Sequence, residues 1–139
     1  MKRKGFTLVE MLGVIVVLGI IALIVFPGIN TAIKQARRDA FEASVNSIVR
    51  AMKTYAYDQE IITGKEYSNK IVDVTAGVLD FDGDVPEEGK IGMTAEKEIV
   101  FEMNDGTWCA RKLDEGEMVI LKLSESGLCD GSSLSELIH

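Results

Sequence analysis

The chain has 139 residues, a formal charge of −7, two cysteines and one histidine. This length allows one modest domain plus an appendage, but not two domains. Because an acidic body repels phosphate backbones, we expect no direct nucleic-acid partner. His139 is the sole imidazole, and neither a CxxC pair nor a Gly-rich phosphate loop occurs, so we expect neither an enzyme nor a resident cofactor.

An apolar run from Phe6 to Ile29 follows the short cationic flank at residues 1–5. As a helix the run would span about 36 Å, enough to cross a hydrocarbon core of about 30 Å. It is too long for an ordinary secretory signal, and no A-x-A-like cleavage site follows it. Glu10 is its only charge, and because a charge in a membrane is costly, Glu10 calls for a partner.

The stretch Lys4–Glu10, KGFTLVE, resembles the class III signal of type IV pilins and of pilin-like proteins in secretion and DNA-uptake machines. The shared features are a short basic leader, Gly5 followed by Phe6, a glutamate just inside the apolar run, and Pro27 near the end of that run. The resemblance covers residues 1–58 at the level of motifs, and beyond them it is architectural.

The resemblance implies that prepilin peptidase cuts between Gly5 and Phe6 and N-methylates Phe6. Glu10 would then pair with the Phe6 amine of a neighbouring subunit, since an opposite charge compensates a carboxylate among apolar helices. Glu10 would thereby set the register between subunits, whereas in a plain membrane anchor it would only lie among lipid headgroups. Pro27 is also assigned to assembly, and we expect a kink or loosening of the helix near residues 23–27.

The implied function is that of a structural subunit of a type IV pilus-like filament, which polymerises with itself and with related minor pilins on an inner-membrane assembly platform. The precursor would be a single-pass protein of the cytoplasmic membrane, in contact with lipid and with its N-terminus inside. The mature protein would lie in an extracellular or envelope-spanning filament. Two alternatives remain open: a pseudopilin of a type II secretion or competence DNA-uptake machine, and a membrane-anchored binding domain that never polymerises.

The fold class is expected to be α+β, with a long N-terminal helix packed on a small antiparallel sheet, as in pilins. Between residues 29 and 58, apolar residues recur at steps of three and four, and neither Gly nor Pro occurs. They indicate one helix from about Phe6 to Tyr57 whose second half offers an apolar stripe to a core. The expected parts are a leader 1–5, a transmembrane or filament-core helix 6–29, and a globular head 30–139 that includes the amphipathic helix half 30–58.

The sheet is expected as an antiparallel meander. Strands at residues 98–103 and 107–113 flank an Asp-Gly pair at 105–106, which is a strong signal for a two-residue turn. Such a turn would pair Met103 with Trp108 and gather the apolar side chains on one face.

Further strands are expected on both sides of this hairpin. A third strand follows at residues 118–123, in which the side chains of Val119, Leu121 and Leu123 alternate inward. Residues 70–74 and 77–81 are candidates for an earlier strand.

Cys109 and Cys129 are the two cysteines, and the hairpin register places Cys109 on the face opposite the apolar side chains. In an exported chain, two cysteines most simply form one disulfide, which would close a loop and contribute about 3 kcal/mol. In a cytosolic chain they would be free thiols, so this prediction depends on export.

Asp80, Asp82 and Asp84 reproduce the first three ligand positions of an EF-hand loop. Val85 and Ile91 stand where that loop needs its glycine and its bidentate glutamate, so an EF-hand is excluded. A looser Ca²⁺ site at these three aspartates is the alternative to a solvated loop.

Lys34, Arg37 and Arg38 form a basic patch just beyond the apolar run. The patch suits anionic headgroups or acidic residues of a neighbouring subunit, and the alternative is a solvated helix face.

Overall fold

The structure is a computed structural model that describes residues 5–114 and 116–138. The basic leader residues Lys2 to Lys4, on which the predicted membrane orientation depends, lie outside the described residues. His139 lies outside them as well.

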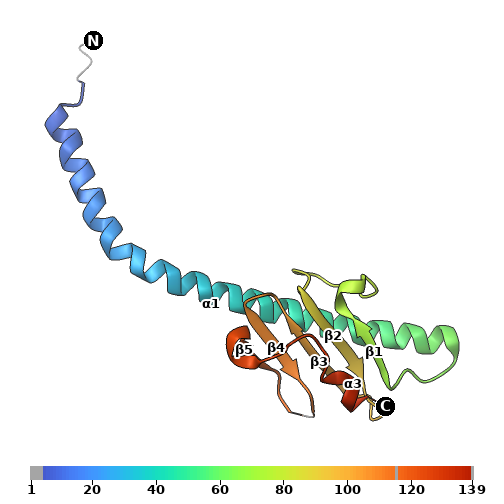
Figure 1. Ribbon diagram of the computed structural model, residues 1–139. Helices are drawn as coiled ribbons and strands as arrows, with labels where there is room; N and C mark the ends of the chain where they lie inside the picture. Colours follow the sequence, from blue (N-terminus) through green and yellow to red (C-terminus); the bar gives the residue numbers. More distant parts are fainter. Residues whose placement is uncertain (1–4, 115, 139) are drawn as a thin grey trace. The chain divides into compact units, whose positions relative to one another are not determined.

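The chain divides into two compact units, Met1–Arg37 and Arg38–His139, and α1, Leu8–Thr63, begins in the first and ends in the second (Figure 1). The prediction of one long helix is confirmed, and the helix extends beyond its predicted end because neither Gly nor Pro occurs between Ile29 and Gly64. Gly64 has a φ of 64°, and its N–H donates to the carbonyl of Glu60 at 2.9 Å. This is a left-handed cap that only glycine adopts without strain.

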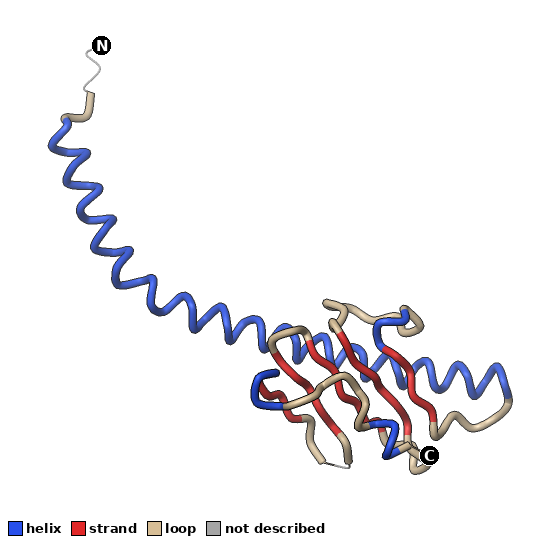
Figure 2. Tube along the Cα trace, in the orientation of Figure 1, coloured by secondary structure: helices blue, strands red, loops and turns tan. Residues whose placement is uncertain are grey.

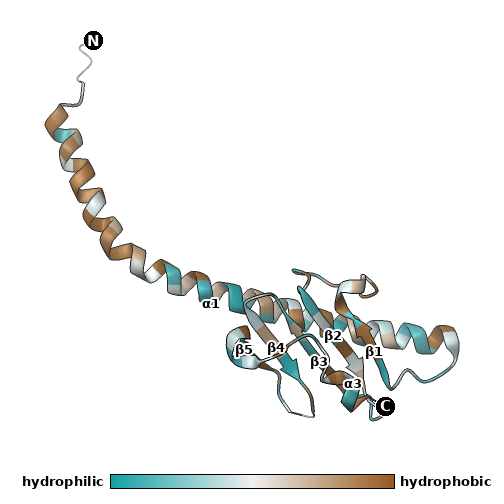
Figure 3. Cartoon of the chain, in the orientation of Figure 1, coloured by the Kyte–Doolittle hydropathy of each residue, from teal (hydrophilic) through white to brown (hydrophobic). Residues whose placement is uncertain are grey.

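In the first unit, α1 carries apolar side chains all round. The span Leu8–Phe26 is long and apolar enough to cross a membrane, by length and composition, and none of it is buried. Figure 3 shows this part of α1 as largely hydrophobic. A kink or loosening was predicted near residues 23–27. The backbone is helical at every one of these positions, so the helix is continuous there.

The second unit contains a five-stranded sheet in which each strand is antiparallel to its sequence neighbours (Figures 1 and 2). The predicted α+β layout with a meander is therefore confirmed, with more strands than expected. The strands are β1 Lys70–Asp73, β2 Glu88–Met93, β3 Ile99–Asn104, β4 Trp108–Lys112 and β5 Val119–Lys122, and a 3-10 turn, Val74–Ala76, follows β1.

The second half of α1 packs on one face of the sheet. Its buried side chains recur at steps of three and four residues, which confirms the predicted apolar stripe. The core includes Phe41, Val45, Ile48, Met52 and Ala56 from α1, and Ile91, Phe101, Met103 and Ala110 from the strands.

β2 is the strand that its sequence does not indicate, because it contains two glycines and begins with a charged residue. Both glycines lie where a neighbour approaches: a Cβ at Gly89 would lie 2.2 Å from the Cβ of Met103. Tertiary packing therefore outweighs strand propensity here. The candidate strand at residues 77–81 is wrong, since Gly77, with a φ of 69°, caps the 3-10 turn and the chain continues as a loop.

The hairpin between β3 and β4 differs from its predicted register by two residues. Met103 pairs with Ala110 and not with Trp108. The carboxylate of Asp105 accepts a hydrogen bond from the N–H of Trp108 at 2.6 Å, which closes a longer loop. Because the shift is an even number, each side chain keeps its predicted face, with Cys109 opposite the helix.

The prediction of which β5 side chains face the core is wrong. Ile120 packs against the core, whereas Val119 and Leu121 are exposed. The register explains this, because Ile120 pairs with Ala110, whose side chain faces the helix. Leu123 is no longer in the strand and begins the short helix α2, Leu123–Ser126.

The C-terminal segment packs on the face of the sheet opposite α1. It includes α3, Leu134–Leu137, and buries Leu134 and Ile138 beside Val100 of β3. Gly92 of β2 leaves room for this contact, because a Cβ there would lie 2.3 Å from Cδ1 of Ile138. The sequence offers no clear periodicity for such a short segment, and its packing was not expected.

Candidate functional site

The apolar helix begins with reciprocal hydrogen bonds between Thr7 and Glu10. Oε2 of Glu10 accepts from the backbone N–H of Thr7 at 2.8 Å and from the Thr7 hydroxyl at 2.9 Å. The backbone N–H of Glu10 donates to the Thr7 hydroxyl at 3.3 Å. This arrangement is a capping box, which satisfies amide groups that have no partner at a helix N-terminus.

Glu10 therefore has a partner within its own chain, in addition to the intermolecular one expected from the sequence. The Thr-x-x-Glu spacing is a known signal of a helix start, so the local pairing with Thr7 could have been predicted. The Glu10 side chain remains exposed, so a cation of another chain can reach it. Its pairing with the Phe6 amine of a neighbour stays a prediction.

The residues predicted for processing immediately precede α1. Gly5 and Phe6 are exposed and lie outside the helix. A Cβ at Gly5 would meet nothing within 4 Å, and the Phe6 side chain is 80% exposed. Such a segment is accessible to a peptidase. The backbone at Pro27 is helical, and its role in assembly stays a prediction.

A disulfide joins Cys109 of β4 to Cys129, in the predicted pairing. Both residues are buried, and Asn104 Nδ2 donates to the carbonyl of Cys129 at 2.7 Å. The disulfide and this hydrogen bond fix the C-terminal segment on the sheet.

An ion pair between a half-buried arginine and a buried glutamate lies on the same face of the sheet and was not expected from the sequence. Arg111 of β4 pairs with Glu102 of β3, whose side chain is fully buried. Arg111 Nη2 also donates to the carbonyl of Leu128 at 2.8 Å. Because charged residues on adjacent strands are common at a solvated face, nothing in the sequence signals that this pair is covered.

The predicted acidic loop is held against α1 through its backbone. The N–H of Asp82 donates to Ser47 Oγ at 3.0 Å, and the N–H of Asp84 donates to Ser44 Oγ at 3.2 Å. Gly83, between them, has a φ of 120°, and a Cβ there would lie 2.4 Å from Ser44 Oγ. Glycine is therefore required by both backbone conformation and close approach.

The carboxylates of Asp80, Asp82 and Asp84 are exposed. Among the residues that the structure describes, no group of three or more His, Cys, Asp or Glu side chains is arranged to hold a metal ion. The structure thus brings these aspartates into one loop but does not assemble them as a ligand set. Ca²⁺ binding here stays a prediction.

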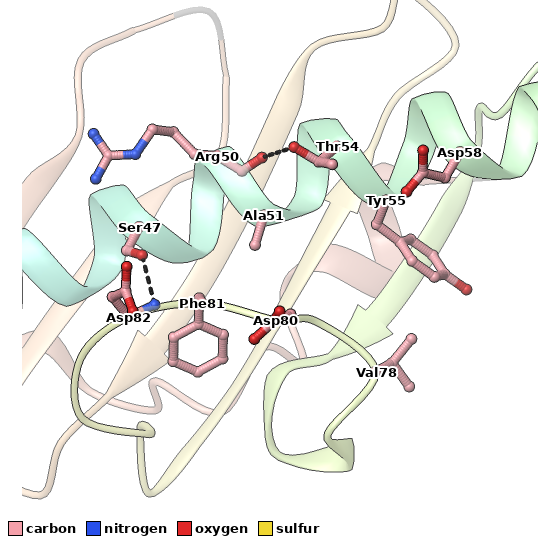
Figure 4. A pocket seen from close by; sticks show the side chains of 10 residues that line it. All are labelled: Ser47, Arg50, Ala51, Thr54, Tyr55, Asp58, Val78, Asp80, Phe81 and Asp82. Carbon is pink, nitrogen blue, oxygen red and sulfur yellow. Dashed lines mark hydrogen bonds between the residues drawn. The ribbon is translucent and has the colours of Figure 1, made fainter.

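A cleft of about 460 Å³ opens between α1 and this loop (Figure 4). Asp58 of α1 and Asp80 and Asp82 of the loop line it, together with the aromatic side chains of Tyr55 and Phe81. We call it the acidic cleft. In the predicted basic patch, the side chains of Lys34 and Arg37 are exposed and that of Arg38 is half-buried.

The N-terminal segment matches a family model, the prokaryotic N-terminal methylation motif, over residues 1–26. No curated protein and no solved structure matches the chain. The motif is the type IV prepilin signal, and together with the apolar span Leu8–Phe26 it fits a pilin or a pseudopilin. The same two features are consistent with a membrane-anchored precursor.

Proposed function

We propose that this chain, which carries the type IV prepilin signal, is a non-enzymatic structural subunit of a pilus-like filament. Prepilin peptidase cleaves the precursor between Gly5 and Phe6. The processed chain then polymerises through α1 with copies of itself and with related minor pilins on an inner-membrane assembly platform. Before assembly it is anchored in the cytoplasmic membrane with its N-terminus inside.

The proposal rests on the methylation motif together with the apolar span Leu8–Phe26, which no other part of the described chain covers. None of Leu8–Phe26 is buried. An apolar surface of this extent is not stable in water and needs a cover. Lipid supplies the cover in the membrane, and neighbouring copies of the same helix supply it in a filament. Because lipid tails and apolar side chains are similar solvents, the exchange between them costs little.

Glu10 supports polymerisation over simple anchoring. A carboxylate among packed apolar helices is costly unless an opposite charge lies close to it. Cleavage after Gly5 creates such a charge, because it leaves a new α-amino group on Phe6, next to the capping residue Thr7. The reaction that frees the helix thus also supplies the cation that a neighbour's Glu10 requires.

Filament formation by Glu10→Gln tests this proposal. Glutamine keeps the acceptor that the capping box needs but removes the charge, so the helix start is retained. In cells with prepilin peptidase and an assembly platform, we expect wild-type filaments in the sheared fraction. The variant should give at least about tenfold fewer filaments, because the loss of an interaction of about 1.4 kcal/mol changes an equilibrium tenfold. The processed variant should still be found in the membrane. Glu96→Gln, an exposed carboxamide substitution in the head, is the matched control and should assemble normally.

The alternatives give different results in the same assay. A pseudopilin would give short filaments confined to the envelope. A non-polymerising anchor would give no filaments. Glu10→Gln would then equal the wild type in the amount of protein in the membrane and in the fraction that is processed. Wild-type filament yield from Glu10→Gln would contradict the role of the Glu10 charge.

A further inference from the structure

The acidic cleft has walls from two parts of the second unit. α1 contributes Tyr55 and Asp58, and the loop contributes Asp80, Phe81 and Asp82. The loop is fixed in place by its backbone hydrogen bonds to Ser44 and Ser47, so the cleft is built into the fold. Its walls therefore combine aromatic faces with carboxylates.

The negative charges of the cleft are not balanced within the described chain. Asp58, Asp80 and Asp82 are exposed, and none of them forms an ion pair with a described residue. Among the described residues that line the cleft, Arg50 is the only cation against three carboxylates, so the lining keeps a net negative charge. Aromatic faces beside free carboxylates suit a Lys or Arg side chain, whose stem is apolar and whose head is charged.

The basic patch at Lys34, Arg37 and Arg38 carries that chemistry. These residues are spaced i, i+3 and i+4 on α1, so they share one side of a helix. No other run of five consecutive described residues contains three cations. Even with Arg38 of the patch included, residues 38–139 contain 10 Lys and Arg against 21 Asp and Glu, a formal charge of −11. The rest of a second head would therefore be repelled by the cleft, whereas the basic patch would be attracted.

We propose that the acidic cleft receives the basic patch of α1 from a second copy of this chain. The inference rests on the proposed function, because a filament supplies second copies at high local concentration and in a fixed register. A single exposed ion pair contributes little, but the contact would recur at every subunit. It would also reduce the mutual repulsion of neighbouring second units, each of which carries −11 over residues 38–139.

Cross-linking between subunits tests the contact directly. The full chain with Arg37→Cys and Asp80→Cys is assembled into filaments and treated with a short bis-maleimide, which leaves the buried Cys109–Cys129 disulfide untouched. A ladder of dimers and larger species on a reducing gel is expected. Arg37→Cys with Glu96→Cys, an exposed position elsewhere in the head, is the control and should give no ladder. Filaments without the Arg37–Asp80 ladder, or with equal ladders for both pairs, would overturn the inference.

Charge reversal gives a second and independent readout. Asp80→Lys with Asp82→Lys, and Lys34→Asp with Arg37→Asp, should each lower filament yield about tenfold, since several weak ion pairs become repulsions. Combining the four substitutions should restore most of the yield. Glu96→Lys should leave the yield unchanged. Failure of the combination to restore assembly, or an equal loss in Glu96→Lys, would contradict a specific contact.

The outcomes also separate this inference from the proposed function and from lipid binding. If the wild type forms no filaments, the proposed function is contradicted, and the inference that rests on it is contradicted as well. Wild-type filaments that tolerate both charge reversals would overturn the inference alone. If reversal at Lys34 and Arg37 lowers the membrane level of the precursor and the cleft substitutions do not compensate, the patch binds anionic headgroups and the inference is wrong.

Discussion

Glu10 has one role in the structure and a second in the proposed function, and both follow from its position on α1. In the single chain its carboxylate satisfies donors of Thr7, which offsets part of the cost of placing a charge in an apolar helix. In the proposed filament the same carboxylate meets a new amine on Phe6 of a neighbour. Because a capping glutamate is exposed at the start of the helix, both roles can use the same atoms.

Arg111 is expected to be the most sensitive charged residue of the head. Arg111→Leu leaves Glu102 buried without its ion-pair partner, which should destabilise the protein by about 3–5 kcal/mol. The measurement is urea unfolding of the detergent-solubilised protein. Glu102→Leu combined with Arg111→Leu should regain most of the loss, because an apolar pair needs no counter-charge. A cost no larger than that of Lys122→Ala, whose ion pair is exposed, would contradict the argument.

Glu60 should give the head a specific sensitivity to acid. Its carboxylate accepts from the N–H of Tyr67 at 2.9 Å and pairs with Lys97 Nζ at 3.2 Å, and these contacts hold the pKa of Glu60 below its ordinary value. A lowered folded-state pKa contributes stability above the unfolded-state pKa, and that contribution is lost as the pH falls through the folded-state value.

The unfolding free energy of wild type and Glu60→Gln between pH 7 and pH 3 checks this linkage. The wild type should lose stability more steeply than the variant once the pH falls below about 4.3, the ordinary pKa of a glutamate. Other carboxylates, such as Asp73, titrate in both proteins and cancel in the difference. Parallel curves would show that the Glu60 contacts do not contribute to folding.

Single residues were predictable where a motif or a pairing rule applied. Glu10 and the Cys109–Cys129 pair are signalled by their sequence context. Glu102 and Arg111 are not, because their burial depends on a C-terminal segment that covers them only in the folded head. Among the described residues, Asp80 belongs to no group of side chains arranged to hold a metal ion, and this depends on loop geometry that the sequence does not specify.

At the scale of elements, the disulfide should hold the C-terminal segment and not the sheet. We expect Cys109→Ala with Cys129→Ala to cost about 3 kcal/mol, by the loop-entropy argument. Hydrogen exchange should accelerate in residues 123–138, while β2 and β3 remain protected by their paired neighbours. Equal acceleration in β3 would contradict this division, because it would mean that the sheet depends on the disulfide.

Elements were predictable in proportion to their local periodicity. α1 repeats its apolar spacing over many turns, and β3 and β4 flank a turn sequence, so their existence followed from the sequence. β2 did not, because Gly89 and Gly92 lower strand propensity and are needed only for contacts with distant residues. The prediction of which β5 side chains face the core was wrong. In the sheet Ile120 pairs with the inward-facing Ala110, and the alternation within β5 does not reveal this register.

At the scale of the whole molecule, charge is distributed unevenly along the chain. The second unit carries −11, whereas the described part of the first unit contains one acid, Glu10, and two bases, Lys34 and Arg37. An acidic head remains soluble outside a membrane and resists nonspecific association. Polymerisation would then depend on contacts made by α1, where the apolar span and the basic patch lie.

Processing at Gly5 is the step on which the whole account depends, and intact mass measures it most directly. The protein is extracted from membranes of cells with and without prepilin peptidase. With the peptidase, the account predicts a chain that starts at Phe6 and carries one added methyl group. Without it, the full precursor should be found. A chain that keeps Met1 to Gly5 in the presence of an active peptidase would contradict the account and favour a plain membrane anchor.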